Sequence, residues 1–335
     1  MKEPCDGVRC PCGSGRPYVG CCLGRHIEKS RANPFPELHE SLKKEMAGRD
    51  FASLDEANAF LKAFYERRNS APSPDFLGLS PDQVRRLIQW PLTDPSDMLV
   101  FNRDLKPEDL SGIPIVSNAV RFLRDLAAAE PLKATAKGNL PPVFAKRLFD
   151  DLDDTPLKEI IKFRSEADSG TVHVLRLVLT MAGLIRKEKG SFRLTRKGRR
   201  AVEDGFSGEN YLDLFLQFAS KFNWGFQDGF SDFRIIQQSV LFSLYLLRKK
   251  ARVYIGSHSL SPYFVRAFPM ILAESNPLYG SAYSLIDRGY IVRFLERFCE
   301  YFGLIGLRVR SEDPLQRTFV FRTSPVFEKF LKWKI

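Results

Sequence analysis

Apolar positions in the second part of the chain recur at a distance of 120 residues. The register holds without a gap over about seventy positions, and the matches are mostly large apolar residues, glycine or proline. Because a duplicated hydrophobic core would keep these residues, the pattern predicts two copies of one fold. The matched pairs are Ile115 and Ile235, Val120 and Val240, Phe122 and Phe242, Leu126 and Leu246, Leu140 and Leu260, Pro142 and Pro262, Phe144 and Phe264, Val172 and Val292, Leu175 and Leu295, and Gly183 to Ile185 with Gly303 to Ile305.

Each copy reads as the same succession of elements. In the first copy a helix is predicted over Ser117–Ala129 and an extended piece over Leu132–Ala134. A second helix begins at Pro141, since proline suits a first turn, and a third covers Ser169–Met181 until Gly183 ends it. Extended runs then flank a polar turn at Lys189–Gly190, which is typical of a hairpin. Helix, strand, helix, helix and hairpin is the element order of a winged helix.

The residues around this hairpin resemble the wing of bacterial winged-helix proteins. The phrase that carries the resemblance runs from Leu184-Ile-Arg-Lys187 to Phe192-Arg-Leu-Thr-Arg-Lys-Gly198. The resemblance implies tandem winged-helix-like repeats, the second with a longer hairpin tip at Ser311–Gln316.

Helical periodicity also precedes the repeats, over Leu54–Arg68 and in a short helix that Ser80 and Pro81 begin. An aromatic-rich stretch, Phe206–Phe233, connects the copies; its rings could stack on bases, but their spacing favours a core between the repeats. The predicted fold class is mainly α with small β-hairpins (α+β). The predicted domains are a knuckle at 1–28, a helical region at 29–110, a first repeat at 111–205, the connecting segment at 206–234 and a second repeat at 235–335.

The formal net charge of +11 favours an acidic partner such as nucleic acid. The sequence contains no run of 18 apolar residues, so it does not suggest a membrane span. The first residues, MKEPCDGVRC, lack the apolar region of a secretory signal. We therefore expect a cytoplasmic protein without a membrane partner.

Five of the six cysteines lie in the first 22 residues. In a reducing cytosol such a cluster indicates a metal site rather than disulfides. Cys10 and Cys12 supply one half of a tetrahedral zinc site, Cys21 and Cys22 the other, and the glycines between them allow the chain to turn back. Free thiols in a flexible tail are the alternative.

The Cys-x-Cys, eight residues, Cys-Cys spacing, with Gly-Ser-Gly-x-x-Tyr18 inside it, resembles the SEC-C motif of the SecA translocation ATPase over residues 8–26. The resemblance implies that Cys10, Cys12, Cys21 and Cys22 bind a structural Zn2+, with Cys5 and His26 as neighbours. It also implies that the knuckle docks a protein partner.

Basic residues crowd the first predicted wing, where eight of the fifteen residues 186–200 are Lys or Arg and only Glu188 opposes them. Such a hairpin suits phosphate contact, and the third helix carries a polar stripe that a recognition helix would turn outward. Lys133, Lys137, Lys146 and Arg147 extend the patch. The candidate nucleic-acid-binding residues are Arg186, Lys187, Lys189, Arg193, Arg196, Lys197, Arg199, Arg200, His173 and Arg176.

Two hypotheses of function remain open. In one, the chain binds nucleic acid, duplex DNA first, through the first wing in a regulatory or mobile-element role. The second copy has Glu296 and Glu300 in place of Arg176 and Thr180, so this hypothesis excludes it from phosphate contact. In the other, the chain is an adaptor that docks proteins through the knuckle and the second repeat. A solvated basic hairpin that binds nothing is the remaining alternative.

Sequence motifs of catalysis are missing: there is no phosphate-cradling glycine loop, no His-Glu-x-x-His and no Gly-x-Ser-x-Gly. The carboxylates from Asp150 to Asp154 could hold Mg2+, but a solvated helix end explains them more simply. We expect a non-enzymatic protein with no small-molecule substrate.

Overall fold

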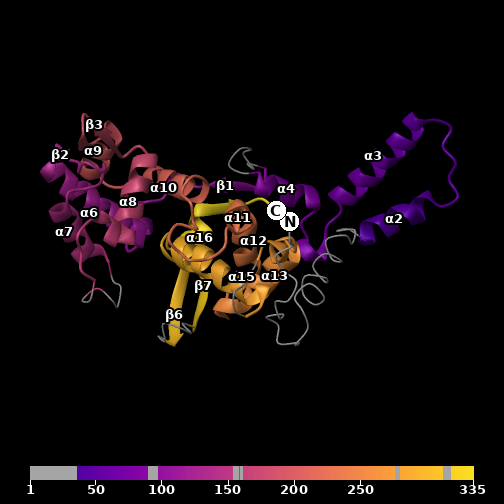
Figure 1. Ribbon diagram of the computed structural model, residues 1–335. Helices are drawn as coiled ribbons and strands as arrows, with labels where there is room; N and C mark the ends of the chain where they lie inside the picture. Colours follow the sequence, from indigo (N-terminus) through magenta and orange to yellow (C-terminus); the bar gives the residue numbers. More distant parts are fainter. Residues whose placement is uncertain (1–35, 90–96, 154–157, 159–160, 276–279, 312–317) are drawn as a thin grey trace, which may run out of the picture. The chain divides into compact units, whose positions relative to one another are not determined.

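The computed structural model describes residues 36–89, 97–153, 158, 161–275, 280–311 and 318–335 (Figure 1). The chain divides between Asn69 and Ser70 into two compact units. The smaller unit holds helix α2 (Pro36–Met46) and most of helix α3 (Leu54–Ser70), which lies where a helix is predicted. An ion pair of 2.5 Å joins Arg67 on α3 to Glu45 on α2. The expected zinc ligands lie outside the described residues.

The fold of the described residues is mainly helical with small antiparallel sheets, which confirms the predicted α+β class. Within these residues, one sheet has two strands and two sheets have three strands each. Each three-stranded sheet belongs to one of two modules in the larger unit, which we define as residues 114–203 and 240–330.

The first module contains the predicted order of helix, strand, helix, helix and hairpin. Lys189 and Gly190 both have positive φ, 47° and 74°, as a two-residue hairpin turn of type I′ requires. Strand order in the sheet is β2-β4-β3, so the last strand of the hairpin lies in the centre. The elements are α6 (Pro114–Ala129), β2 (Leu132–Lys133), α7 (Pro142–Leu152), η3 (Glu166–Asp168), α8 (Gly170–Met181), β3 (Ile185–Glu188), β4 (Ser191–Leu194) and α9 (Arg196–Glu203).

The second module repeats this order, with strand order β5-β7-β6 and a π-helical segment that extends its third helix. Its elements are α12 (Val240–Lys250), β5 (Ile255–Gly256), η4 (Ser257–Ser259), α13 (Ser261–Ala267), α14 (Ile271–Glu274), α15 (Ala282–Tyr290), η5 (Ile291–Glu300), β6 (Ile305–Ser311), β7 (Thr318–Thr323) and α16 (Pro325–Phe330).

At the end of each hairpin, one side-chain hydroxyl group makes the same two hydrogen bonds. The Thr195 hydroxyl donates to the Gly183 carbonyl at 2.6 Å and accepts from the Gly198 amide at 3.0 Å, so it caps α9. The Ser324 hydroxyl donates to the Gly303 carbonyl at 2.6 Å and caps α16 in the same way. Sequence analysis missed these helices. Arg196, Lys197, Arg199 and Arg200, which it assigned to the wing, lie on α9 because Thr195 begins a helix there.

The aromatic stretch between the modules is core, as its spacing predicts. Phe215, Phe218, Trp224 and Phe233 are buried, and the Trp224 indole donates to the Phe218 carbonyl at 2.9 Å. This connector (204–239) contains α10 (Gly208–Ser220) and α11 (Arg234–Gln238). Ahead of the first module lie η2 (Pro74–Phe76), α4 (Pro81–Ile88), β1 (Leu99–Phe101) and α5 (Pro107–Leu110), and β1 pairs with the final strand β8 (Leu331–Trp333).

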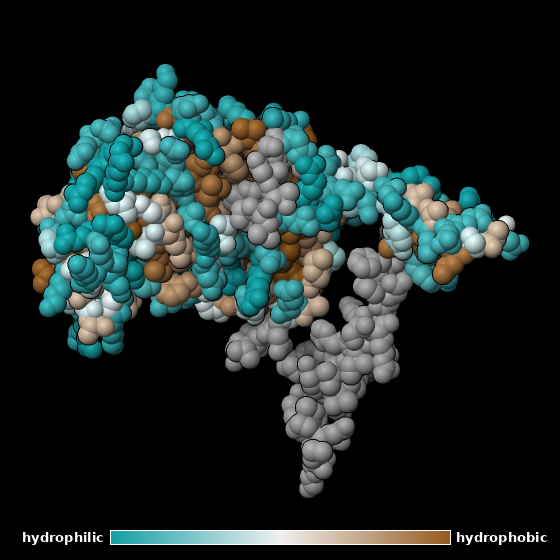
Figure 2. Space-filling model, turned by 90° about the horizontal axis from the view of Figure 1, so that it is seen from above, coloured by the Kyte–Doolittle hydropathy of each residue, from teal (hydrophilic) through white to brown (hydrophobic). Residues whose placement is uncertain are grey.

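The face seen in Figure 2 is hydrophilic over most of the first module, at the left. Among the helices of the described residues, none combines the length and apolar character needed to cross a membrane.

Gly198 is required by close packing of α9 on the start of β3. A Cβ at this position would lie 2.1 Å from the Leu184 carbonyl oxygen, which belongs to backbone and cannot move aside cheaply. We expect Gly198→Ala to lower the free energy of unfolding by about 1–3 kcal/mol in urea titrations. Gly170→Ala is the matched control, since no atom lies within 4 Å of its Cβ position and its φ is not positive. Equal stability of the two variants would contradict this packing.

Candidate nucleic-acid interface

The polar stripe of α8 faces inward, onto a buried carboxylate. Glu166 has no exposed surface, and its Oε1 lies 2.7 Å from both Arg176 Nε and His173 Nδ1. Its Oε2 accepts a hydrogen bond of 2.6 Å from the Leu140 amide. The prediction that Arg176 belongs to an outward recognition face is therefore wrong. A buried carboxylate must be neutralised, and Arg176 is the cation that does so.

His173 is also engaged, because its ring stacks on Phe226 of the connector with centroids 5.3 Å apart and planes 18° apart. Ser169 caps α8 by accepting from the Val172 amide, and its hydroxyl donates to Asp153 at 3.0 Å. Three of the four residues of the stripe thus hold α8 in place, and only Thr180 is exposed. The third helix is a structural element that docks on the connector.

Three more of the candidate residues have carboxylate partners. Lys197 pairs with Asp213 and also donates to the Ala182 carbonyl at 2.9 Å. Arg199 pairs with Glu130 at 2.5 Å, and the other oxygen of that carboxylate accepts from the Leu194 amide. Arg186 pairs with Glu188 at 3.0 Å on the exposed face of the hairpin. Lys146 and Arg147, expected to extend the patch, pair with Asp150 and Asp125. These charges are partly or wholly neutralised within the fold.

The remaining candidates form no ion pair with any described residue. Lys187 and Lys189 lie at the tip of the hairpin, Arg193 is on the outer face of β4, and Arg196 and Arg200 share one exposed face of α9. They surround the hairpin and the start of the following helix. The cationic surface is therefore narrower than the sequence predicts, and it lies on the sheet and α9 rather than on α8.

Four lysines converge on a hollow of about 470 Å3 at the open end of the sheet. Lys187 and Lys189 come from the hairpin, and Lys133 and Lys137 come from β2 and the loop after it. No Asp or Glu lines the hollow, whose other lining residues are Ala134, Thr135, Ala136, Gly138, Gly190 and Ser191. We call these residues the lysine hollow.

Backbone hydrogen bonds fix the shape of the lysine hollow. The Ala134 amide donates to the Gly190 carbonyl at 2.8 Å, which ties the end of β2 to the hairpin turn. In the loop that follows, Asn139 donates its amide to the Thr135 hydroxyl at 3.0 Å, and Gly138 turns with a φ of 79°. Lys187 Nζ lies 2.8 Å from the position that a Cβ of Gly138 would take. The ammonium group of Lys187 thus lies directly against this loop.

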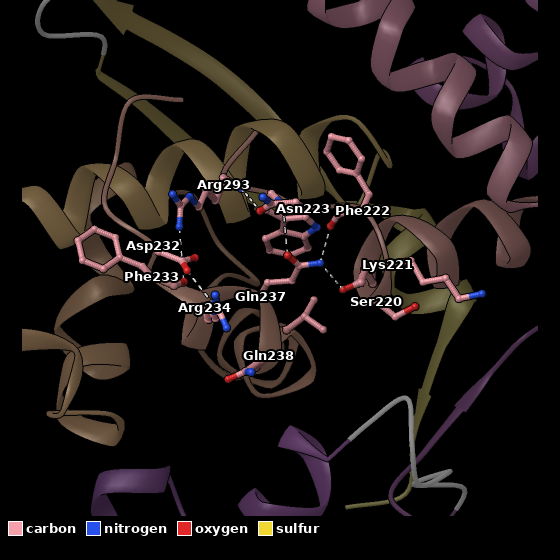
Figure 3. Close-up of a pocket in the computed structure, with 14 residues that line it drawn as sticks. Ser220, Lys221, Phe222, Asn223, Asp232, Phe233, Arg234, Gln237, Gln238 and Arg293 are labelled. Atoms are coloured by element: carbon pink, nitrogen blue, oxygen red, sulfur yellow. Dashed lines mark hydrogen bonds and ion pairs between the residues drawn. The ribbon is translucent and has the colours of Figure 1, made fainter. Parts of the chain in front are cut away.

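A second hollow, of about 420 Å3, lies at the end of α10 (Figure 3). Its polar side chains serve the fold: the Gln237 amide nitrogen donates to the Ala219 and Phe222 carbonyls, at 3.0 and 2.6 Å, and its oxygen accepts from the Trp224 amide. Arg293, also in its wall, forms a buried two-point ion pair with Asp228, at 2.6 and 3.2 Å. Arg297 nearby donates to the Phe226 carbonyl at 2.7 Å, and burial lowers the pKa of its guanidinium group.

The acidic end of α7 and the lone cysteine also have structural surroundings. Asp150 pairs with Lys146, and Asp151 pairs with Arg121. Cys299 is fully buried, and burial raises the pKa of its thiol well above the ordinary value. Within the described ranges no group of three or more His, Cys, Asp or Glu side chains is placed to hold a metal ion.

Ser261, His258 and Asp287 meet in the second module, which the separate sequence contexts of the histidines did not suggest. His258 Nδ1 lies 2.6 Å from Asp287 Oδ2, but the Ser261 hydroxyl donates to the same carboxylate. Ser261 is fully buried. The hydroxyl therefore is not placed to give its proton to the imidazole, as a nucleophile in such a triad would.

Fold and surface together define a mainly helical α+β protein with two sheet-bearing modules and a cationic hollow on the first. Residues 110–207, which span the first module, match the family model of the Y4jL N-terminal domain. Comparison with curated proteins and with solved structures found no match.

The buried Glu166 cluster yields a test of the inward-facing α8. Removal of the carboxylate in Glu166→Ala leaves Arg176 buried without its partner, so we expect a loss of about 3–5 kcal/mol in the free energy of unfolding. Glu188→Ala removes an exposed partner of Arg186 and should cost about 1 kcal/mol or less. Urea unfolding of both variants measures the difference, and similar costs would show that the Glu166 cluster does not anchor the helix.

Proposed function

We propose that this protein binds nucleic acid, duplex DNA in the first place, through the lysine hollow and the adjacent free arginines. The observation that carries the proposal is the convergence of four lysines from two segments on a hollow that no carboxylate lines. Like charges repel, so a fold does not gather four ammonium groups for its own stability. An anion bound in the hollow would offset this repulsion.

A phosphodiester backbone suits this surface better than an isolated anion. Arg193 on the sheet and Arg196 and Arg200 on α9 continue the positive charge beyond the hollow, and all three form no ion pair with the residues described. Lysine and arginine displace condensed counterions from a phosphate backbone, and such contacts position a protein without reading bases. The element order of the module and the resemblance of its hairpin to a winged-helix wing support duplex DNA as the form bound.

The test is fluorescence anisotropy of a labelled duplex across salt concentrations. We expect Lys187→Ala/Lys189→Ala to lower the slope of log affinity against log salt by about two, because each lost phosphate contact removes about one. Lys146→Ala/Arg147→Ala is the matched control, since those cations already have carboxylate partners and the slope should hold.

Two results contradict the proposal: absence of salt-dependent binding by the parent protein, or equal slopes for the two double variants. Thermal unfolding of each variant establishes that it is folded. Without DNA binding, the remaining hypothesis is an adaptor that docks proteins through the N-terminal knuckle and the second repeat.

We also propose that the N-terminal segment is a zinc knuckle of the SEC-C type and that the protein is not an enzyme. The donor set supports the first part, since four cysteines in two close pairs suit tetrahedral Zn2+. Cys10, Cys12, Cys21 and Cys22 would hold the ion, which leaves no open position for a substrate and makes a structural role the fitting one. The metal would supply the folding energy that so short a segment lacks.

The knuckle is tested by metal content. The parent protein should carry about one equivalent of zinc, and Cys21→Ser should lose most of it because three protein thiolates hold the ion more weakly than four. Cys299→Ser is the matched control, since that thiol is buried in the second module. Elemental analysis after dialysis measures the difference, and unchanged zinc in Cys21→Ser would refute the ligand assignment.

A further inference from the structure

The outer face of the second module's sheet carries an arginine and tyrosine cluster. Phe319 and Phe321 of β7 point inward and are buried, so Arg322, the next residue along the strand, points outward and is exposed. The guanidinium carbons of Arg308 and Arg322 lie 4.3 and 5.0 Å from the centre of the Tyr254 ring. We call Tyr254, Arg308 and Arg322 the arginine face.

Strand register relates this face to the first module. In the central strands, Arg193 stands opposite Arg186, and Arg322 stands opposite Gly306. These are equivalent positions, because Leu194 opposite Ile185 and Thr323 opposite Ile305 are the next pairs in the two ladders. Both sheets therefore present an outward arginine at the same place on the central strand. The 120-residue alignment did not show this, since the second hairpin is longer.

The neighbouring positions differ in a way that raises the charge of the second face. By the same register, Arg308 takes the place of Glu188, the carboxylate that pairs with Arg186 in the first module. Among the residues described, neither Arg308 nor Arg322 forms an ion pair with a carboxylate. Arg252 and Arg310, both exposed, lie close along the chain. Within the described part of the chain, the arginine face thus holds cations without a carboxylate partner.

The surface between these arginines is open. Gly306 lies beside Arg322 in the ladder, and no atom is within 4 Å of the position that its Cβ would take. Gly256, opposite Val320, is also exposed. Stacking on the tyrosine ring restrains each guanidinium plane while its N–H groups remain available for a phosphate. A polyanion can approach this face closely.

From these observations we infer that the second module binds the phosphate backbone of nucleic acid through Arg308 and Arg322. This extends, and rests on, the proposed function, which assigned phosphate contact to the first module alone. Figure 1 shows the hairpin of β6 and β7 well apart from the sheet labelled β2 and β3. The arginine face is therefore a separate contact, either with a second stretch of one duplex or with a second duplex.

The loss-of-function test is Arg308→Ala/Arg322→Ala in the full-length, zinc-loaded protein. We expect the slope of log affinity against log salt to fall by about two, on a labelled duplex of about four helical turns. Arg85→Ala/Arg234→Ala is the matched control, because those arginines are exposed and paired with Asp82 and Asp232. A thermal unfolding curve shows that each variant is folded, and Arg308→Lys/Arg322→Lys should keep the slope.

A gain-of-function test uses the register of the two sheets. Gly306→Arg gives the second module the residue that the first has at this place, in open space and without positive φ. We expect the slope to rise by about one, which no general damage to the fold would produce.

Two labelled duplexes of about one turn each separate the two geometries. If the protein bridges two duplexes, energy transfer occurs between them and is lost in Arg308→Ala/Arg322→Ala. If both modules contact a single duplex, the protein prefers the longer duplex, and the same variant loses this preference. An unchanged slope in that variant, beside a lowered slope in Lys187→Ala/Lys189→Ala, overturns this inference and leaves the proposed function standing. No DNA binding by the parent protein overturns both.

Discussion

A charge removed from water must be paired, and this requirement decides what the third helices of both modules do. In the first module Arg176 of α8 is buried against Glu166, and in the second Arg293 of η5 is buried against Asp228. Loss of one partner of such a pair costs about 3–5 kcal/mol, so each helix is held in place. His173, 120 residues before Arg293, also contacts the connector, through its stacked ring. The connector is thus the common anchor of both modules.

Because Arg176 and Arg293 of the third helices are buried in ion pairs, the exposed cations without a described carboxylate partner lie elsewhere. In the first module it gathers on the hairpin, the lysine hollow and α9, and in the second on the outer face of the sheet. The sheets can carry this charge because their inner faces are well anchored. Phe192 and Phe321, at the same place on the central strands, are both buried, and the hydroxyls of Thr195 and Ser324 lock both hairpin exits. In each sheet, therefore, the inner face anchors the sheet and the outer face carries the charge.

The sequence predicts the elements of the first module well, because apolar periodicity and turn residues are local signals. The hairpin turn at Lys189–Gly190 and the third helix of the first module both appear where the pattern places them. The inward direction of Arg176 could not be predicted, because a polar stripe looks the same whether it faces water or a buried carboxylate such as Glu166. Lys133 and Lys137 were expected to extend the basic patch of the hairpin, but the hollow that they line with Lys187 and Lys189 could not be predicted, because it forms only where the β2 loop lies against the hairpin. The basic residues after Thr195 were assigned to the wing because of their charge, whereas Thr195 in fact caps a helix that contains them.

The sheet of the first module breaks a local rule of stability. Like charges directly opposite on neighbouring strands are destabilising by roughly 0.2–1 kcal/mol, yet Arg186 stands opposite Arg193. Glu188 offsets part of this repulsion in the first module, whereas in the second Arg308 takes the position of that carboxylate and stacks with Arg322 on Tyr254 instead. The exposed arginines of the two sheets therefore have different neighbours, a carboxylate in the first sheet and an aromatic ring in the second.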